Sequence, residues 1–132
     1  MRSVVLAFLM FGVFGAEAEV MAAYRTHDVL AWPSTYEGFG MVLIEAMSQR
    51  LPVVATPVGS ARALVEAGGT GLLVPPRDPA ALAAALTRAL ADPSLRLRLA
   101  DAAFDLVRDM TWTRTAQATL AVYEKARANG HG

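Results

Sequence analysis

Three short apolar segments without polar alternation constrain the fold of this chain most. They are residues 28–32 (DVLAW), 52–55 (PVVA) and 71–74 (GLLV), each followed within two residues by proline. Continuous apolar runs of this length are typical of parallel strands whose two faces are both buried. Patterns typical of helices precede or separate them, at residues 17–26, 40–49 and 60–67. Strands that alternate with helices predict an α/β fold with a doubly wound, Rossmann-like parallel sheet.

The expected helices carry start signals and apolar faces. The residues placed to cap helices are Ser60, Asp78, Asp92 and Thr113, and both aspartates precede a proline at the first helical position. The apolar face of the helix over residues 40–49 is expected to be Val42, Leu43, Ala46 and Met47. A second apolar stripe consists of Leu82, Ala85, Leu86, Ala89 and Leu90. The aromatic residues expected to pack in the core are Trp32, Trp112 and Tyr123. We expect a single domain over 1–132, with alternating strands and helices over 1–77 and a helical extension over 78–132.

Residues 1–18 allow two interpretations. A basic residue, an apolar run and the sequence AEA at 16–18 are typical of a secretion signal with its cleavage site. The same stretch also fits a buried strand over residues 3–9 that ends in a turn at Gly12 and Gly15. These residues alone leave both interpretations open. With this strand the sheet would have about four strands, which is fewer than a complete doubly wound sheet contains.

The composition excludes several classes of function. The chain has 12 basic and 12 acidic residues, so it lacks the excess of positive charge that nucleic-acid surfaces need. It has no cysteine, and its histidines, His27 and His131, have no companions at ligand spacing, so we expect no metal site. No uncharged apolar run reaches roughly 18 residues, which argues against a membrane-spanning helix. The high hydrophobic content of 55% is better explained by a surface that meets a partner, and peripheral contact with a membrane stays open.

The segment best suited to bind a ligand follows the strand over residues 28–32, because ligands lie beyond the carboxyl ends of strands in an open parallel sheet. Gly38 and Gly40 flank Phe39 where the next helix begins. Glycines at such a place let backbone amides approach a phosphate closely, and the helix dipole favours the negative charge.

Two carboxylates make this expectation more specific. Glu37 lies just ahead of the helix, and Glu45 lies roughly 7.5 Å along the helix axis from Gly40. Carboxylates repel phosphate but accept hydrogen bonds from hydroxyl groups. A ligand with a diphosphate at the helix start and a hydroxylated ring on either side fits this layout, and a nucleotide sugar is such a ligand.

Glu37 and Glu45 also match the E-x7-E motif of the retaining GT-B glycosyltransferases of family 4, which are also known as group 1. The chain resembles that family in further motifs, which are D-V-x-x-x-P-S at 28–34, E-G-F-G, E-A-M, P-V-V-A-T at 52–56 and T-G-L-L-V-P-P followed by D-P. The order and spacing of these motifs extend the resemblance over nearly the whole chain.

The resemblance implies a site for a UDP- or GDP-sugar. Glu37 would be the catalytic residue that bonds the hydroxyls of the donor sugar, and Glu45 would bind the ribose hydroxyls. The backbone amides of residues 38–42 would hold the sugar and the diphosphate. The implied donor-binding residues are Ser34, Glu37, Gly38, Phe39, Gly40, Met41, Val42 and Glu45. A plain loop role for Ser34 and a core position for Phe39 stay open.

The resemblance further implies transfer of a hexosyl group with retention of configuration, commonly without a metal or other cofactor. It favours a core strand over residues 3–9 and a cytoplasmic location. Compared with the family, the chain lacks the amino-terminal domain and the part of the donor domain whose Arg and Lys neutralise the diphosphate. Arg50 stands where relatives usually have glycine, at a helix end where a left-handed conformation costs arginine about 1 kcal/mol.

We therefore expect an incomplete, truncated GT-B carboxyl-terminal domain, inactive without the missing domain or a chain that supplies it. The alternatives are the nucleotide-sugar-binding subunit of a split enzyme and a small exported protein without catalytic function.

Overall fold

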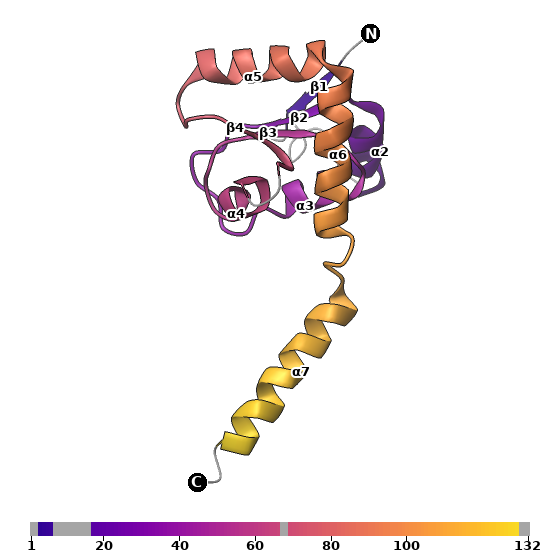
Figure 1. Cartoon of the computed structure of the whole chain (residues 1–132), viewed down its shortest axis with the longest axis vertical. Helices are drawn as coiled ribbons and strands as arrows, with labels where there is room; N and C mark the ends of the chain where they lie inside the picture. Colours follow the sequence, from indigo (N-terminus) through magenta and orange to yellow (C-terminus); the bar gives the residue numbers. More distant parts are fainter. Residues whose placement is uncertain (1–2, 7–16, 67–68, 130–132) are drawn as a thin grey trace.

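The computed structural model describes residues 3–6, 17–66 and 69–129 (Figure 1). Its centre is a parallel sheet of four strands in sequential order, β1 (Val4–Leu6), β2 (Val29–Trp32), β3 (Val53–Ala55) and β4 (Gly71–Leu73). Leu30 lies opposite Val53, and Val53 lies opposite Gly71. The three predicted strands and the parallel α/β class are confirmed.

The alternation of side chains along the strands divides the core into two layers. Leu30 and Val53 point into a large cluster with α2 (Glu17–Thr26), α3 (Met41–Ser48), α4 (Ala61–Glu66) and α6 (Pro93–Val107). Val29 and Val54 point to the other face, where α5 (Pro79–Ala91) covers them with the predicted stripe. All four valine and leucine side chains are at most 1% exposed. Because burial of such a side chain on either face contributes about 1.5–3 kcal/mol, every position of these strands is apolar.

The helix caps are only partly as the sequence predicts. The carboxylate of Asp78 accepts a hydrogen bond from the amide of Ala81 at 2.9 Å, and that of Asp92 accepts one from Leu95 at 2.9 Å, as expected. Hydrogen bonds from the Ser94 hydroxyl, which is the largest cause, and from the Leu95 amide hold the pKa of Asp92 below its ordinary value. The expectation of a Thr113 cap is wrong, because α7 (Trp112–Asn129) begins earlier and Thr111 accepts the amide of Arg114 at 3.2 Å.

The last helix, α7, projects away from the rest of the domain (Figure 1). None of its residues is buried. Trp32 packs in the core as expected, but Trp112 is 86% exposed and Tyr123 is 69% exposed, so the expectation that these two aromatic residues pack in the core is wrong. A short connection over residues 108–111 joins the end of α6 to the start of α7.

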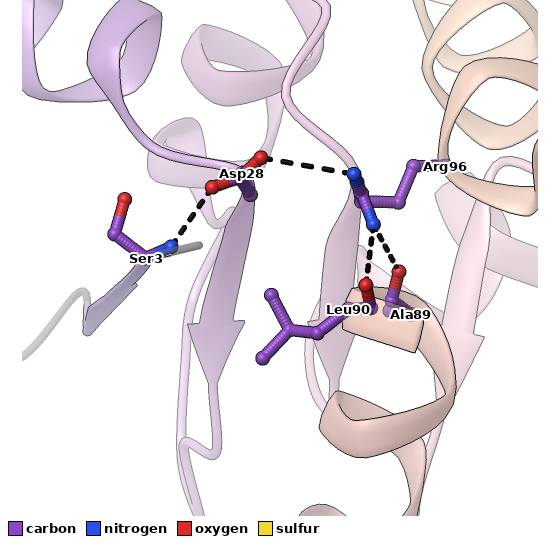
Figure 2. A network of polar contacts seen from close by, with 5 residues as sticks. All are labelled: Ser3, Asp28, Ala89, Leu90 and Arg96. Atoms are coloured by element: carbon purple, nitrogen blue, oxygen red, sulfur yellow. Dashed lines mark hydrogen bonds and ion pairs between the residues drawn. The ribbon is translucent and has the colours of Figure 1, made fainter. Parts of the chain in front are cut away.

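The amino-terminal segment contributes a strand over Val4–Leu6, which pairs with β2. The remainder of the predicted strand and the predicted turn at Gly12 and Gly15 lie outside the described residues. At the amino end of the sheet, the carboxylate of Asp28 accepts a hydrogen bond from the amide of Ser3 at 2.8 Å and lies 3.8 Å from the guanidinium of Arg96 (Figure 2). Arg96 also donates to the carbonyls of Ala89 and Leu90, each at 2.8 Å. This network ties two strands to the junction of α5 and α6. In the part of the chain that the structure describes, no helix is long and apolar enough to span a membrane.

Candidate functional site

Two loops meet at the carboxyl ends of β2 and β3. The hydroxyl of Thr56, which is buried after β3, donates to the carbonyl of Ser34, which follows β2. The hydroxyl of Ser60 donates to the carbonyl of Phe39 in the same way. Ser60 does precede α4 as predicted, but its hydroxyl group is used for this contact between the loops. The two hydrogen bonds hold the loop over residues 33–40 against the loop over residues 56–60.

The glycine turn, residues 37–40, begins α3. Gly40 has φ +75° in the left-handed region and is the N-cap residue, with no side chain hydrogen-bonded as a cap. A Cβ at this position would lie 3.2 Å from the hydroxyl oxygen of Ser60 and 3.5 Å from the ring of Trp32, so glycine suits both the backbone conformation and the space. The first amides of a helix have no partner one full turn back within the helix. Here the amide of Leu43 donates to the carbonyl of Gly40 at 3.0 Å, and Gly40 supplies no capping side chain for the amides before it. The start of α3 is therefore suited to accept an anion.

Gly59 packs directly against the backbone of the glycine turn. Its φ is +54°, and a Cβ there would lie 2.8 Å from the carbonyl oxygen of Gly38 and 2.9 Å from that of Glu37. Only glycine permits this approach between the two loops. Gly59 was not among the residues predicted from the sequence, although a glycine in a turn just after a strand is a signal for such a role.

Of the two acidic residues of the motif, Glu37 precedes this helix start and Glu45 lies within α3. Glu37 is partly exposed, and its carboxylate accepts the amide of Gly38 at 3.1 Å. Glu45 is partly buried on α3, and its carboxylate accepts the hydroxyl of Tyr24 at 3.1 Å. Burial raises the pKa of Tyr24 above its ordinary value, and the charge of Glu45 and its hydrogen bond raise it further. Tyr24 is a second residue that the sequence analysis did not connect with the site.

The remaining candidate residues differ in how accessible they are. Phe39 is 63% exposed and Met41 is 48% exposed, so Phe39 does not occupy the core position that the sequence left open. Val42 is partly buried against the core. The hydroxyl of Ser34 donates to the carbonyl of Tyr36 at 2.8 Å, a contact that shapes the loop. The candidates over residues 34–42 thus form the loop and the start of α3, whereas Glu45 lies further along α3, where its carboxylate contacts Tyr24 of α2.

Open space borders the loop on two sides. A pocket of about 470 Å³ lies beside the helix start, between Phe39 and Met41 on one side and Trp112 and Arg114 on the other. A smaller pocket of about 220 Å³ lies beyond the strand ends and includes Thr35 in its lining. Among the described residues, no group of three or more His, Cys, Asp or Glu side chains is placed to hold a metal ion.

Comparison with known proteins identifies the family. The family model described as glycosyl transferases group 1 matches residues 9–105. The chain belongs to the group 1 glycosyltransferases. It is 43% identical to the D-inositol 3-phosphate glycosyltransferase of Kineococcus radiotolerans, an alignment that covers 84% of this chain and 27% of that protein. This glycosyltransferase chain therefore spans about a quarter of the length of that relative.

Solved structures support the same assignment. The sucrose-phosphate synthase of Thermosynechococcus elongatus matches with a TM-score of 0.73 and 39% identity, over 81% of this chain and 27% of that one. The Anabaena protein Alr3699/HepE, solved in complex with UDP-glucose, matches with a TM-score of 0.72 and 28% identity, over 83% and 30%. The fold is that of a carboxyl-terminal GT-B glycosyltransferase domain.

Proposed function

We propose that this chain binds the nucleotide-sugar donor of a retaining hexosyltransferase at the start of α3. The observation that carries the proposal is the glycine turn, which leads into α3 without a side-chain cap and is held by the loop over residues 56–60. Glu37 lies in this turn, and Glu45 lies on the helix that follows it. The structural similarity to a protein that binds UDP-glucose supports the choice of ligand.

Each part of the ligand has a chemically suitable partner in this arrangement. The amides of residues 38–42 would hold the sugar and the diphosphate, with the Gly38 amide giving up its contact with the Glu37 carboxylate when the ligand binds. The helix dipole would stabilise the negative charge that grows on the diphosphate as the sugar leaves. Glu37 would accept hydrogen bonds from the sugar hydroxyls, and Glu45 would accept them from the ribose. Ser34, Phe39 and Met41 would complete the donor site.

The role of Glu37 gives the proposal its test. Binding of UDP-glucose and of GDP-mannose to the chain should be measured by calorimetry, because the base is not specified by the residues present. Glu37→Gln should weaken binding of the nucleotide sugar by roughly tenfold to a hundredfold, the range for hydrogen bonds to a charged group. Binding of the free nucleoside diphosphate, which lacks the sugar, should change little.

Glu124→Gln is the matched control, because this glutamate lies on the exposed helix α7 away from the glycine turn. It should bind both ligands like the unaltered chain. Equal binding of the nucleotide sugar by the Glu37→Gln variant would contradict the proposed role, and absence of binding by the unaltered chain would contradict the donor site itself.

We further propose that the chain alone has negligible transferase activity, because it spans about a quarter of the length of its relatives. We also propose that it acts in the cytoplasm. Turnover of the same nucleotide sugars, followed by release of nucleoside diphosphate, checks the first point. Rapid transfer by the isolated chain would contradict it.

A further inference from the structure

Tyr24 makes a polar contact that the proposed donor site does not yet use. This tyrosine lies on α2 and is 1% exposed, and its hydroxyl donates to the Oε2 atom of Glu45 on α3 at 3.1 Å. The two residues are 21 positions apart in the sequence and meet only because α2 packs against α3.

A carboxylate on a glutamate side chain has three rotatable bonds and samples several positions unless a partner holds it. The Tyr24 hydroxyl is such a partner, because the buried ring fixes where the hydroxyl lies. One accepted hydrogen bond uses only part of the capacity of a carboxylate, which offers about four lone-pair sites. Glu45 can therefore be held by Tyr24 and still accept hydroxyl groups of a ligand.

The contact between the helices does not depend on Tyr24 alone. Arg25, the next residue on α2, donates to the side-chain oxygen of Gln49 beyond the end of α3 at 3.3 Å. The apolar residues Val20, Met21 and Ala23 of α2 pack against the same core as Leu43 and Met47 of α3. Loss of the tyrosine hydroxyl should thus leave the helices in place and free only the Glu45 carboxylate.

We infer that Tyr24 is a positioning residue that orients the Glu45 carboxylate toward the ribose hydroxyls of the donor. The inference rests on the proposed function, since it concerns how one of the two acidic residues of that site is held. It predicts that Tyr24 acts on recognition of the ribose and on no other part of the nucleotide.

The test compares UDP and GDP with their 2′,3′-dideoxy counterparts, which lack the ribose hydroxyls. The quantity measured is the ratio of the dissociation constants of the dideoxy and ordinary nucleotides for the full chain. The unaltered chain should prefer the ordinary nucleotide by about tenfold or more, as expected for hydrogen bonds to a charged group. Glu45→Gln should lower this ratio close to one, and Tyr24→Phe should lower it by about twofold to tenfold.

Thr70→Val is the matched control. Thr70 is also 1% exposed, and its hydroxyl also makes a single buried hydrogen bond, to the carbonyl of Leu64. Thr70→Val should reduce thermal stability as Tyr24→Phe does, while the ratio of the dissociation constants of the dideoxy and ordinary nucleotides stays unchanged. A merely structural role of Tyr24 would make the two variants alike in both measurements.

The outcomes separate the inference from the function on which it rests. If the unaltered chain binds neither nucleotide, the donor site is refuted and the inference with it. If the preference for ribose survives Glu45→Gln, the role of Glu45 is refuted. If Glu45→Gln removes the preference and Tyr24→Phe leaves it intact, only the inference is refuted.

Discussion

Substitution of Gly59 by alanine tests whether the close approach of the two loops holds the glycine turn. A Cβ at Gly59 would lie within 2.9 Å of the carbonyl oxygens of both Glu37 and Gly38. Both are backbone atoms, so the added methyl group cannot be accommodated by rotation of a side chain. Either the loop over residues 56–60 or the glycine turn must move.

The expected cost has two parts. The first is conformational, because φ is +54° at Gly59 and alanine in the left-handed region costs about 1–2 kcal/mol. The second is steric, and insertion of a methyl group into a tightly packed place costs about 1–3 kcal/mol. Together they predict a loss of about 2–5 kcal/mol in the free energy of unfolding, and a displaced turn should weaken nucleotide-sugar binding by roughly tenfold or more.

Gly69→Ala separates these two parts. Gly69 has a similar φ of +62°, but a Cβ there would meet no atom within 4 Å. Chemical denaturation of both variants gives the conformational cost from Gly69→Ala and the steric cost from the difference, expected at about 1–3 kcal/mol. Calorimetry with UDP-glucose and GDP-mannose measures binding. Equal destabilisation by the two substitutions, with equal binding, would refute the reasoning that Gly59 supports the turn.

Three further changes have predictable effects. Arg50 has φ +58°, in the left-handed region, and is held by an ion pair with Asp101 and by the ring of Phe104, whose centroid lies 4.1 Å away. Alanine at this position would keep the backbone strain and lose both contacts, so Arg50→Gly should be about 1 kcal/mol more stable than Arg50→Ala in chemical denaturation. The reverse order of stability would contradict this account. The pKa of Tyr24 is raised in the folded state, so the folded chain keeps a proton that the unfolded chain releases above pH 10. The contribution of Tyr24 to the free energy of unfolding is therefore fully present below that pH and falls as the pH rises. Above pH 10 the free energy of unfolding should fall more steeply in the unaltered chain than in Tyr24→Phe, by about 1.4 kcal/mol per pH unit. Chemical denaturation at several alkaline pH values measures this slope, and parallel plots of the free energy against pH for the two proteins would contradict the prediction. Removal of residues 112–132 should change the free energy of unfolding by less than about 0.5 kcal/mol, because α7 buries no residue, and a larger loss would show that the helix packs on the domain.

The strands could be predicted from the sequence because burial on both faces leaves a strong apolar signal. The runs around Leu30 and Val53 are short and bounded by proline, which favours buried strands over helices. The caps at Asp78 and Asp92 could also be predicted, because the aspartate carboxylate accepts a free amide of the first turn and the proline after it has no amide hydrogen to satisfy. The glycine turn ahead of α3 could be predicted in the same way, because its residues lie within one continuous segment. The binding roles of Glu37 and Glu45 stay predictions.

Features that depend on contacts between distant segments could not be predicted in the same way. Nothing near Tyr24 in the sequence shows that its hydroxyl reaches Glu45, because the contact follows from how α2 packs against α3. The Gly59 support depends likewise on how far apart β2 and β3 place their loops. The choice of Thr111 over Thr113 as a cap depends on where α6 ends, and a pattern of threonines cannot specify that position.

The network of Asp28 and Arg96 lies at the amino end of the sheet (Figure 2). The glycine turn follows the opposite, carboxyl end of β2. The two ends are separated by the length of the strands, and changes at sites this far apart usually add without coupling. Substitutions around Arg96 should therefore change the free energy of unfolding while the geometry of the glycine turn stays as it is. Conversely, substitutions of the exposed side chains of Phe39 and Met41 should leave the frame of the sheet intact.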